Sequence, residues 1–323
     1  TLLSKNTLYQ LITIIMNEQT AYAKTITGIY NKVYQGKNIG KIPTYIPELL
    51  NVSPDKFGIA IYTLSGKTFG IGDYQEKFSI QSIAKVLSLS MAYDIFGDSI
   101  WERVSVEPSG TSFNSLLQLE ANNGIPRNPL INAGAIVICD ILLSHFKNAE
   151  EEFIKFVRQL ANDPTINYSE EIAASEKEVG YRNFALCYYI KSLGNIENEP
   201  ERVLDFYFKL CSIELTCESL AYIFTFLAND GITLHNQQRI LPHVYTKRIN
   251  AIMQTCGFYD ESGEFAFRVG LPGKSGVGGG IVAIMPGHYA IAVWSPRLNE
   301  KGNSYRGVKF LEGFTMQTQI SVF

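Results

Sequence analysis

Cysteine and histidine are scarce in this chain of 323 residues, and their numbers and spacing exclude several kinds of site. The five cysteines are an odd number, and Cys211 and Cys217 are not spaced as a redox pair. Because all five lie in apolar surroundings, we expect buried, reduced thiols in a cytosolic protein. The four histidines are scattered without ligand spacing, which predicts no metal site and offers no obvious histidine base.

Strong charge and long apolar runs are also missing. The formal net charge is −3, from 28 basic and 31 acidic residues, which argues against a nucleic-acid partner. No apolar run approaches the roughly 18 residues of a membrane span. We recognise no signal peptide, so we expect a cytoplasmic protein without a membrane segment. With 46% apolar and 18% charged residues, the chain can bury a sizeable core, as two domains or one large composite.

One stretch that is present points to chemistry: Gln81-Ser82-Ile83-Ala84-Lys85. If this stretch is helical, Ser82 and Lys85 lie one turn apart on one face. A hydroxyl beside an amine can act as a nucleophile with its own base, and Ser-x-x-Lys is a signature of the penicillin-binding and β-lactamase class of serine enzymes. The same spacing occurs at 53–56, which is typical of a helix start, and at 144–147, at the polar end of a predicted helix.

The neighbours of Ser82 give it a different context. Two short strand-like runs, 58–63 and 68–71, precede it, and an apolar helical run, 86–92, follows it. Ser82 is therefore predicted where a sheet edge meets a helix N-terminus, and backbone N–H groups there can hold a developing oxyanion. The structural alternative is that Ser82 is a helix cap or a small core residue and that Lys85 extends to solvent. This stretch alone leaves both interpretations open.

Strand patterns lie at both ends of the chain, and helical patterns fill the middle. Further strands are predicted at 265–269, 280–285 and 289–294. Helices are predicted at 7–34, 128–146, 149–162, 171–192, 199–211, 216–229 and 304–320. The simplest assembly is an α+β fold with one antiparallel sheet built from residues 1–81 and 246–323. Residues 82–245 would form a mainly helical domain inserted between them, with the site in the crevice.

A second motif lies late in the chain, at Lys274-Ser275-Gly276-Val277-Gly278-Gly279-Gly280. Serine enzymes of the class above carry a Lys-Thr-Gly-type motif on a strand beside the serine. A Val277 N–H that points into the crevice would be a second oxyanion donor beside the Ser82 N–H. The structural alternative is a flexible glycine-rich connection with an exposed Lys274. The strict Ser-Asp-Asn element of the class is missing, although Tyr181-Arg182-Asn183 has the Tyr-x-Asn form.

Taken in order along the chain, these motifs make the sequence recognisable: it resembles the serine-dependent glutaminase family. The resembling blocks span most of the chain and are Tyr45-Ile46-Pro47-Glu48-Leu49, Gln81-Ser82-Ile83-Ala84-Lys85, Glu107-Pro108-Ser109-Gly110, Asn128-Pro129-Leu130-Ile131-Asn132-Ala133-Gly134-Ala135-Ile136, Ser175-Glu176, Arg182-Asn183-Phe184-Ala185, Asp205-Phe206-Tyr207-Phe208, Cys211-Ser212-Ile213-Glu214, Thr216-Cys217-Glu218-Ser219, Cys256-Gly257-Phe258-Tyr259-Asp260 and Lys274-Ser275-Gly276-Val277.

The resemblance implies a β-lactamase/transpeptidase-like fold and hydrolysis of L-glutamine to L-glutamate and ammonia, without metal or other cofactor. It also implies a homodimer or homotetramer. Two alternatives remain: a hydrolase of the same fold that acts on β-lactams or cell-wall peptides, and a non-catalytic homologue that binds an amino acid. The missing Ser-Asp-Asn element weighs against the first, and the presence of Ser82, Lys85 and Tyr259 weighs against the second.

The resemblance also implies roles for individual residues. The catalytic group would be Ser82 as nucleophile, Lys85 as base, Tyr259 as proton relay and Val277 as oxyanion donor. The substrate-binding residues, besides Ser82, Tyr259 and Val277, would be Tyr45, Gln81, Asn132, Glu176, Asn183 and Tyr207. Glu176 suits the ammonium of the substrate, and Asn183 falls two helical turns further on the same face. Taken singly, each residue has a structural interpretation: Glu176 would be a charged side chain on a solvent-exposed helix face, Asn132 a helix cap and Tyr259 a core tyrosine.

Overall fold

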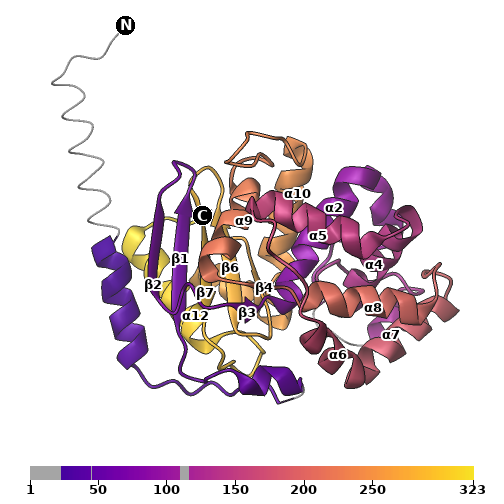
Figure 1. The fold of residues 1–323 in the computed structure, drawn as a ribbon, viewed down its shortest axis with the longest axis horizontal. Helices are drawn as coiled ribbons and strands as arrows, with labels where there is room; N and C mark the ends of the chain where they lie inside the picture. Colours follow the sequence, from indigo (N-terminus) through magenta and orange to yellow (C-terminus); the bar gives the residue numbers. More distant parts are fainter. Residues whose placement is uncertain (1–22, 45, 110–115) are drawn as a thin grey trace, which may run out of the picture.

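A five-stranded antiparallel sheet joins the two ends of the chain. The computed structural model describes residues 23–44, 46–109 and 116–323. The strands are β1 (Gly58–Thr63), β2 (Thr68–Gly72), β5 (Gly273–Ser275), β6 (Gly280–Met285) and β7 (Tyr289–Trp294), in the order β2-β1-β7-β6-β5 (Figure 1). Because β1 pairs with β7, the central strand, an early strand lies inside the sheet against a strand from near the chain's end.

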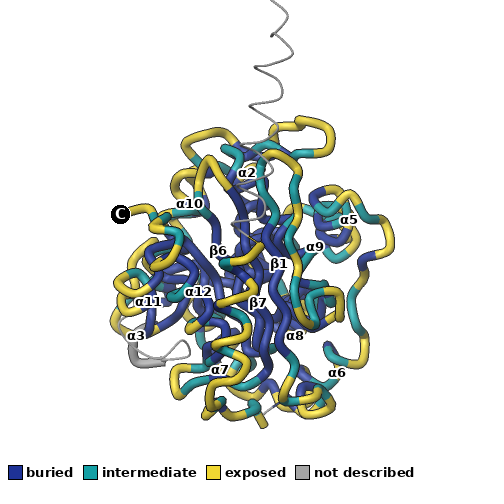
Figure 2. The backbone as a smooth tube through the Cα atoms, turned by 90° about the vertical axis from the view of Figure 1, so that its left-hand side faces the viewer, coloured by how far each residue is buried: buried dark blue, intermediate teal, exposed yellow. Residues whose placement is uncertain are grey.

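Side-chain alternation divides the sheet into two packed faces. Ile59 and Ile61 of β1 face a core cluster that includes residues of the helix at 23–35 and of α12 (Tyr305–Thr318). Ala60 belongs to the other cluster, with residues of α9 (Cys217–Ala228). Because both faces are covered, β7 is buried along its whole length (Figure 2). Its sequence is accordingly a continuous apolar run.

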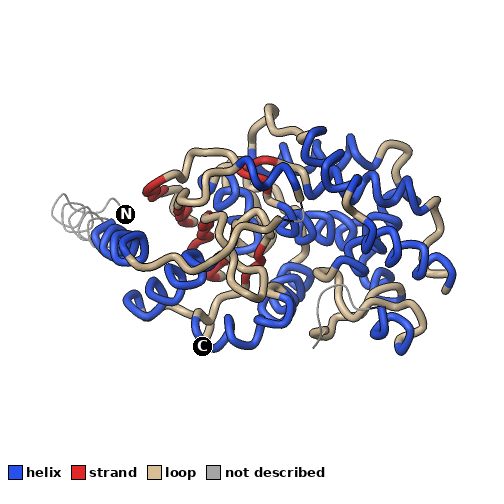
Figure 3. Tube along the Cα trace, turned by 90° about the horizontal axis from the view of Figure 1, so that it is seen from below, coloured by secondary structure: helices blue, strands red, loops and turns tan. Residues whose placement is uncertain are grey.

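Most of the remaining helices pack beside the sheet as a second body (Figures 1 and 3). Its principal helices are α2 (Ala84–Phe96), α4 (Asn132–His145), α5 (Ala149–Ala161), α6 (Glu170–Glu178), α7 (Tyr181–Ser192), α8 (Pro200–Cys211) and α10 (His243–Cys256). The shorter elements are η1 (Pro47–Asn51), η2 (Gln81–Ile83), η3 (Gly97–Glu102), α3 (Leu116–Ala121), η4 (Tyr259–Glu261), α11 (Ser262–Arg268) and the pair β3 (Phe78–Ser79) and β4 (Glu214–Leu215).

The α+β class and the antiparallel sheet built from both chain ends are as predicted. The division at residues 81/82 and 245/246 stays a prediction, and α9, from the expected helical segment, packs on the sheet. Part of the predicted helix 7–34 lies outside the described residues, and the described part is helical at 23–35. In the described part of the chain, we find no helix long and apolar enough to cross a membrane.

Two local predictions are wrong. The strand expected at 265–269 is the helix α11, in which Phe265 is buried and Phe267 is 90% exposed. An Arg268–Glu264 ion pair one turn apart supports that helix. The helix expected at 171–192 is two helices, α6 and α7, with Gly180 between them. A Cβ on Gly180 would lie 2.6 Å from the ring of Phe208, so this close approach requires glycine.

Candidate active site

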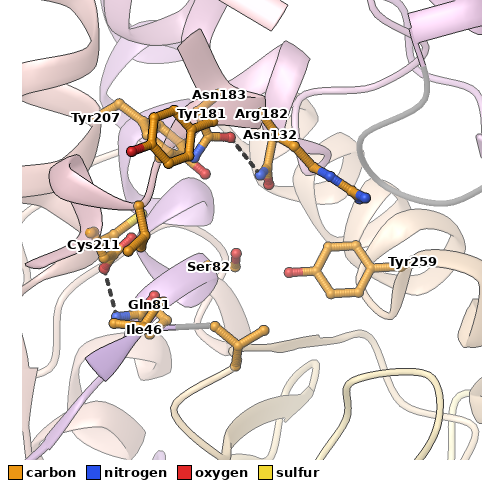
Figure 4. A pocket seen from close by; sticks show the side chains of 14 residues that line it. Ile46, Gln81, Ser82, Asn132, Tyr181, Arg182, Asn183, Tyr207, Cys211 and Tyr259 are labelled. Atoms are coloured by element: carbon orange, nitrogen blue, oxygen red, sulfur yellow. Dashed lines mark hydrogen bonds between the residues drawn. The ribbon is translucent and has the colours of Figure 1, made fainter. Parts of the chain in front are cut away.

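A cavity of about 540 Å³ gathers nearly all the predicted site residues. Eight of them line it: Gln81, Ser82, Asn132, Glu176, Asn183, Tyr207, Tyr259 and Val277 (Figure 4). Lys85 lies beside the cavity and is 1% exposed. Tyr45 is outside the described residues. The lining comes from the turn before α2, from α4 and α6 to α8, and from the late segments that carry Tyr259 and Val277.

The turn that carries Ser82 is held tightly against the glycine-rich motif. Ser82 lies in η2, between β3 and α2, and is 7% exposed. A Cβ on Gly276 would lie 2.4 Å from the carbonyl oxygen of Ile80, and one on Gly278 would lie 2.3 Å from that of Ser79. Only glycine allows backbone to approach backbone so closely. This contact therefore brings Val277 into the same cavity as Ser82.

Lys85 is a buried amine that is hydrogen-bonded to the side chain of Asn132. Its Nζ donates a 2.6 Å hydrogen bond to Oδ1 of Asn132, so it does not extend to solvent. Burial lowers the pKa of Lys85 to about 8, while the charge of Glu176 acts in the opposite direction. A substantial fraction of the amine is therefore neutral near pH 8, as a general base requires.

Tyr259 points its hydroxyl toward Ser82 across the cavity (Figure 4). Burial raises the pKa of Tyr259, and a side-chain hydrogen bond with Ser82 acts in the opposite direction. Its backbone has φ of +57°, in the left-handed region that is costly for a residue with a Cβ. Such a conformation is typical of residues that a functional site holds in place.

Lys274 is fully buried, so the alternative of an exposed lysine in a flexible connection is wrong. Its Nζ donates to the carbonyl oxygens of Gly257 (3.0 Å) and Ser275 (2.7 Å). The same nitrogen lies 4.2 Å from the centroid of the Tyr259 ring. Burial, with the charge of Lys85, holds the pKa of Lys274 well below its ordinary value. Lys274 thus ties β5 to the turn that leads to Tyr259.

Glu176 is 7% exposed, so the alternative of a solvated helix charge is wrong. Its Oε1 accepts a 2.7 Å hydrogen bond from Nε2 of Gln81. Burial raises the pKa of Glu176 to about 7, while this hydrogen bond and the charge of Lys85 lower it. The cavity therefore holds a carboxylate that becomes charged near neutral pH.

Asn132 and Asn183 face each other on the opposite wall. Nδ2 of Asn132 donates a 2.9 Å hydrogen bond to Oδ1 of Asn183 (Figure 4). Asn132 is the first residue of α4 and does not cap it; Asn128 accepts from the N–H groups of Leu130 and Ile131 there. The cap alternative for Asn132 is therefore wrong, and its amide is oriented by Lys85 on one side and Asn183 on the other.

The remaining lining residues were not predicted. They are Ile46, Val179, Gly180, Tyr181, Arg182 and Cys211. Arg182 extends its guanidinium across the cavity toward the side of Tyr259 (Figure 4). Ile46 and Arg182 adjoin a predicted residue in sequence, and the other four lie within four residues of one; this proximity was the available signal. Within the described part of the chain, no group of three or more His, Cys, Asp or Glu side chains is placed to hold a metal ion.

Solved structures and curated sequences resemble the chain over nearly its whole length. A structure described as the probable glutaminase YbaS has a TM-score of 0.89 and 33% identity, and the match covers 94% of this chain and 98% of that one. The Bacillus subtilis probable glutaminase has a TM-score of 0.79 and 35% identity, over 87% and 95%. The Saccharophagus degradans glutaminase is 55% identical, over 94% of this chain and 98% of its own.

These similar proteins show the class to which the chain belongs: it is an amidohydrolase with the β-lactamase-like fold, as predicted. The model of the glutaminase family matches residues 40–323, and the Christiangramia forsetii glutaminase is also 55% identical, over 88% of this chain and 93% of its own. The chain therefore belongs to the glutaminase family. The predicted glutaminase is confirmed, and the comparisons give no support to a β-lactam hydrolase.

The close contact between the glycine-rich turn and the turn that carries Ser82 can be tested with Gly276→Ala. The added methyl meets the Ile80 carbonyl, so Val277 and Ser82 must move apart. We expect kcat/KM for L-glutamine to fall at least about tenfold, because misplacing Val277, the predicted oxyanion donor, would cost transition-state stabilisation. Steady-state ammonia release and thermal unfolding would be measured together. Gly28→Ala is the matched control, because no atom lies within 4 Å of its added Cβ; equal activity in both variants would contradict the prediction.

Proposed function

We propose that this glutaminase hydrolyses L-glutamine to L-glutamate and ammonia through an ester on Ser82. The observation that supports this most directly is the cavity itself. Ser82 meets the Tyr259 hydroxyl there, a buried amine with a lowered pKa lies beside it, and an acidic side chain lines the same space. Such a combination of nucleophile, base and charge partner suits acyl transfer to an amino-acid substrate.

In the proposed first half-reaction, Ser82 Oγ attacks the side-chain amide carbon of glutamine. Neutral Lys85 accepts the proton, and the N–H groups of Ser82 and Val277 stabilise the oxyanion. The C–N bond then breaks and ammonia leaves after it receives a proton by way of Tyr259. In the second half, water attacks the γ-glutamyl ester, Lys85 again accepts a proton, and glutamate is released as Ser82 Oγ regains its hydrogen.

The other end of the substrate carries an ammonium and a carboxylate. We assign the ammonium to Glu176, because it is the one acidic side chain that lines the cavity among the described residues. Neutral donors suit the carboxylate, and the proposed ones are Asn132, Asn183, Tyr207 and Tyr45. Gln81 lines the cavity next to the nucleophile and would contact the substrate there. Tyr45 rests on the family resemblance alone.

We also propose a homo-oligomer, dimer or tetramer, in the cytoplasm. The oligomer rests on the family resemblance, because single exposed apolar side chains such as Phe267 (90% exposed) are ordinary on a protein surface. All five cysteines are free and buried, as suits a reducing compartment. Light scattering on the purified chain should give at least twice the monomer mass; a monomer at micromolar concentration would refute the oligomer. Cell fractionation would test the location.

The nucleophile is tested by ammonia release from L-glutamine, L-asparagine and D-glutamine. We expect wild type to prefer L-glutamine, and Ser82→Ala to lose about 10⁴-fold or more in kcat, as loss of a nucleophile does elsewhere. Ser90→Ala is the control, because Ser90 is likewise buried but lies in α2, where its hydroxyl donates to the carbonyl of Val86 (2.7 Å). If wild type is inert, or Ser82→Ala stays fully active, the mechanism is wrong. Glutamate binding without turnover in wild type would indicate a non-catalytic binder.

The acid limb of the pH profile tests Lys85 and Glu176 together. Lys85 must be neutral and Glu176 charged, so kcat/KM should fall as the pH drops through about 8 and then about 7. Glu176→Gln should remove the lower step and raise KM about 10- to 100-fold, because a charged hydrogen-bond partner is lost. Rates would be measured from about pH 5.5 to 9.5. An unchanged KM in Glu176→Gln would exclude Glu176 as the ammonium partner.

A further inference from the structure

Ser79 lies behind the cavity wall and is hydrogen-bonded to two residues that line it, Cys211 and Gln81. Its Oγ donates a hydrogen bond to the carbonyl oxygen of Cys211 (3.0 Å) and accepts one from Nε2 of Gln81 (2.9 Å). Nε2 of Gln81 also donates to Oε1 of Glu176 at 2.7 Å. Ser79 is 5% exposed and Gln81 is 2% exposed, so water is largely excluded from these bonds. The result is one chain of bonds from the end of α8 through the Ser82 turn to α6.

The chemistry of the donors fixes the direction of every bond in this chain. A carbonyl oxygen can only accept, so the single proton of Ser79 goes to Cys211. Ser79 Oγ must then accept from its other neighbour, and the side-chain oxygen of Gln81 cannot serve as a donor. The amide nitrogen therefore faces Ser79, and its second hydrogen faces Glu176. The amide oxygen of Gln81 remains available as an acceptor for the substrate.

The rest of Gln81 has little freedom to adjust. Its backbone has φ of +50°, in the left-handed region. Ideal Cβ positions on Gly276 and Gly278 lie 3.3 and 3.4 Å from Cβ and Cγ of Gln81, so the glycine-rich turn packs directly on the stem of its side chain. Rotation of the terminal amide is the main freedom left. A rotated amide would turn its oxygen toward the carboxylate of Glu176, which is repulsive.

We propose that Ser79 is a positioning residue that fixes the amide of Gln81 and thereby sets the affinity of the cavity for the ammonium of the substrate. This rests on the proposed role of Glu176 as ammonium partner. Ser79 does not line the cavity, and of the two hydrogen-bond partners of its Oγ only Gln81 also bonds to Glu176, so its effect on the ammonium site passes through Gln81. It should therefore change substrate binding and leave the acyl-transfer steps at Ser82 nearly unaffected.

The ionisation of Glu176 gives a second readout. Burial raises its pKa, and the hydrogen bond from Gln81 and the charge of Lys85 on α2 lower it. The other titratable groups that line the cavity are Tyr207 and Cys211 on α8, Tyr259 in η4, and Tyr181 and Arg182 on α7. On elements packed against α6, Asp205 of α8 pairs with Lys177, and Glu48 of η1 accepts from Asn51. A weaker bond from Gln81 should move the ionisation of Glu176 to higher pH.

Ser79→Ala tests the proposal. At pH 7 we expect KM for L-glutamine to rise about five- to tenfold, because a buried hydrogen bond is lost, with kcat within about twofold of wild type. The lower step of the acid limb of kcat/KM should move up by about half a pH unit. Ser90→Ala, which leaves this chain of bonds intact, should show neither change. Ser79→Cys, with its weaker acceptor, should fall between wild type and Ser79→Ala, and it replaces Ser79→Ala if that variant does not fold.

A double-mutant cycle separates positioning from a general structural effect. If Ser79 acts through Gln81, Ser79→Ala should add no further rise in KM in a Gln81→Met background. A further rise of the full size there would overturn the proposal, as would a loss of kcat at unchanged KM in Ser79→Ala. Failure of the proposed function looks different: Glu176→Gln would then keep its KM, whatever Ser79→Ala does.

Discussion

The structure depends on the contact between two backbone turns, one from each end of the chain. The carbonyl oxygens of Ser79 and Ile80 lie where a Cβ on Gly278 or Gly276 would collide with them. Because the approach is backbone to backbone, no change of side-chain rotamer can loosen it. It fixes the turn that carries Ser82 relative to β5 and β6, and so relative to the sheet. The helices then supply the wall of the cavity that faces this junction.

Burial, more than any single charge pair, sets the electrostatics of the site. Lys85 and Lys274 are almost fully buried, and Glu176 is nearly so. Loss of hydration lowers the pKa of each lysine and raises that of the glutamate. The neutral form of each side chain is therefore more populated than it would be in water at the same pH. Burying such groups is costly, because each ionisable side chain must be desolvated. Their concentration at one cavity is the mark of a functional site.

Sequence reasoning succeeded where the signal was local or carried by the resemblance. The Ser82–Lys85 spacing and the late glycine-rich motif pointed to residues that lie together at one cavity, and the short apolar runs of β1 and β7 predicted strands of the sheet. It failed where long-range contacts decide. The burial of Lys274 and the bond from Lys85 to Asn132 depend on elements far apart in sequence. The run at 265–269 has strand-like residues, yet it buries only one side and forms a helix.

The pairing of β1 with β7 has a consequence for the order of synthesis. Gly58 lies opposite Trp294 in the register, so the central ladder of the sheet joins residues separated by most of the polypeptide. While the ribosome is still translating the helical middle, β1 has an edge with no neighbour, and an unpaired apolar edge invites association with other chains. Closing so long a loop is also slow. The nascent enzyme must therefore remain inactive, and exposed to aggregation or chaperone capture, until its last strands have left the ribosome.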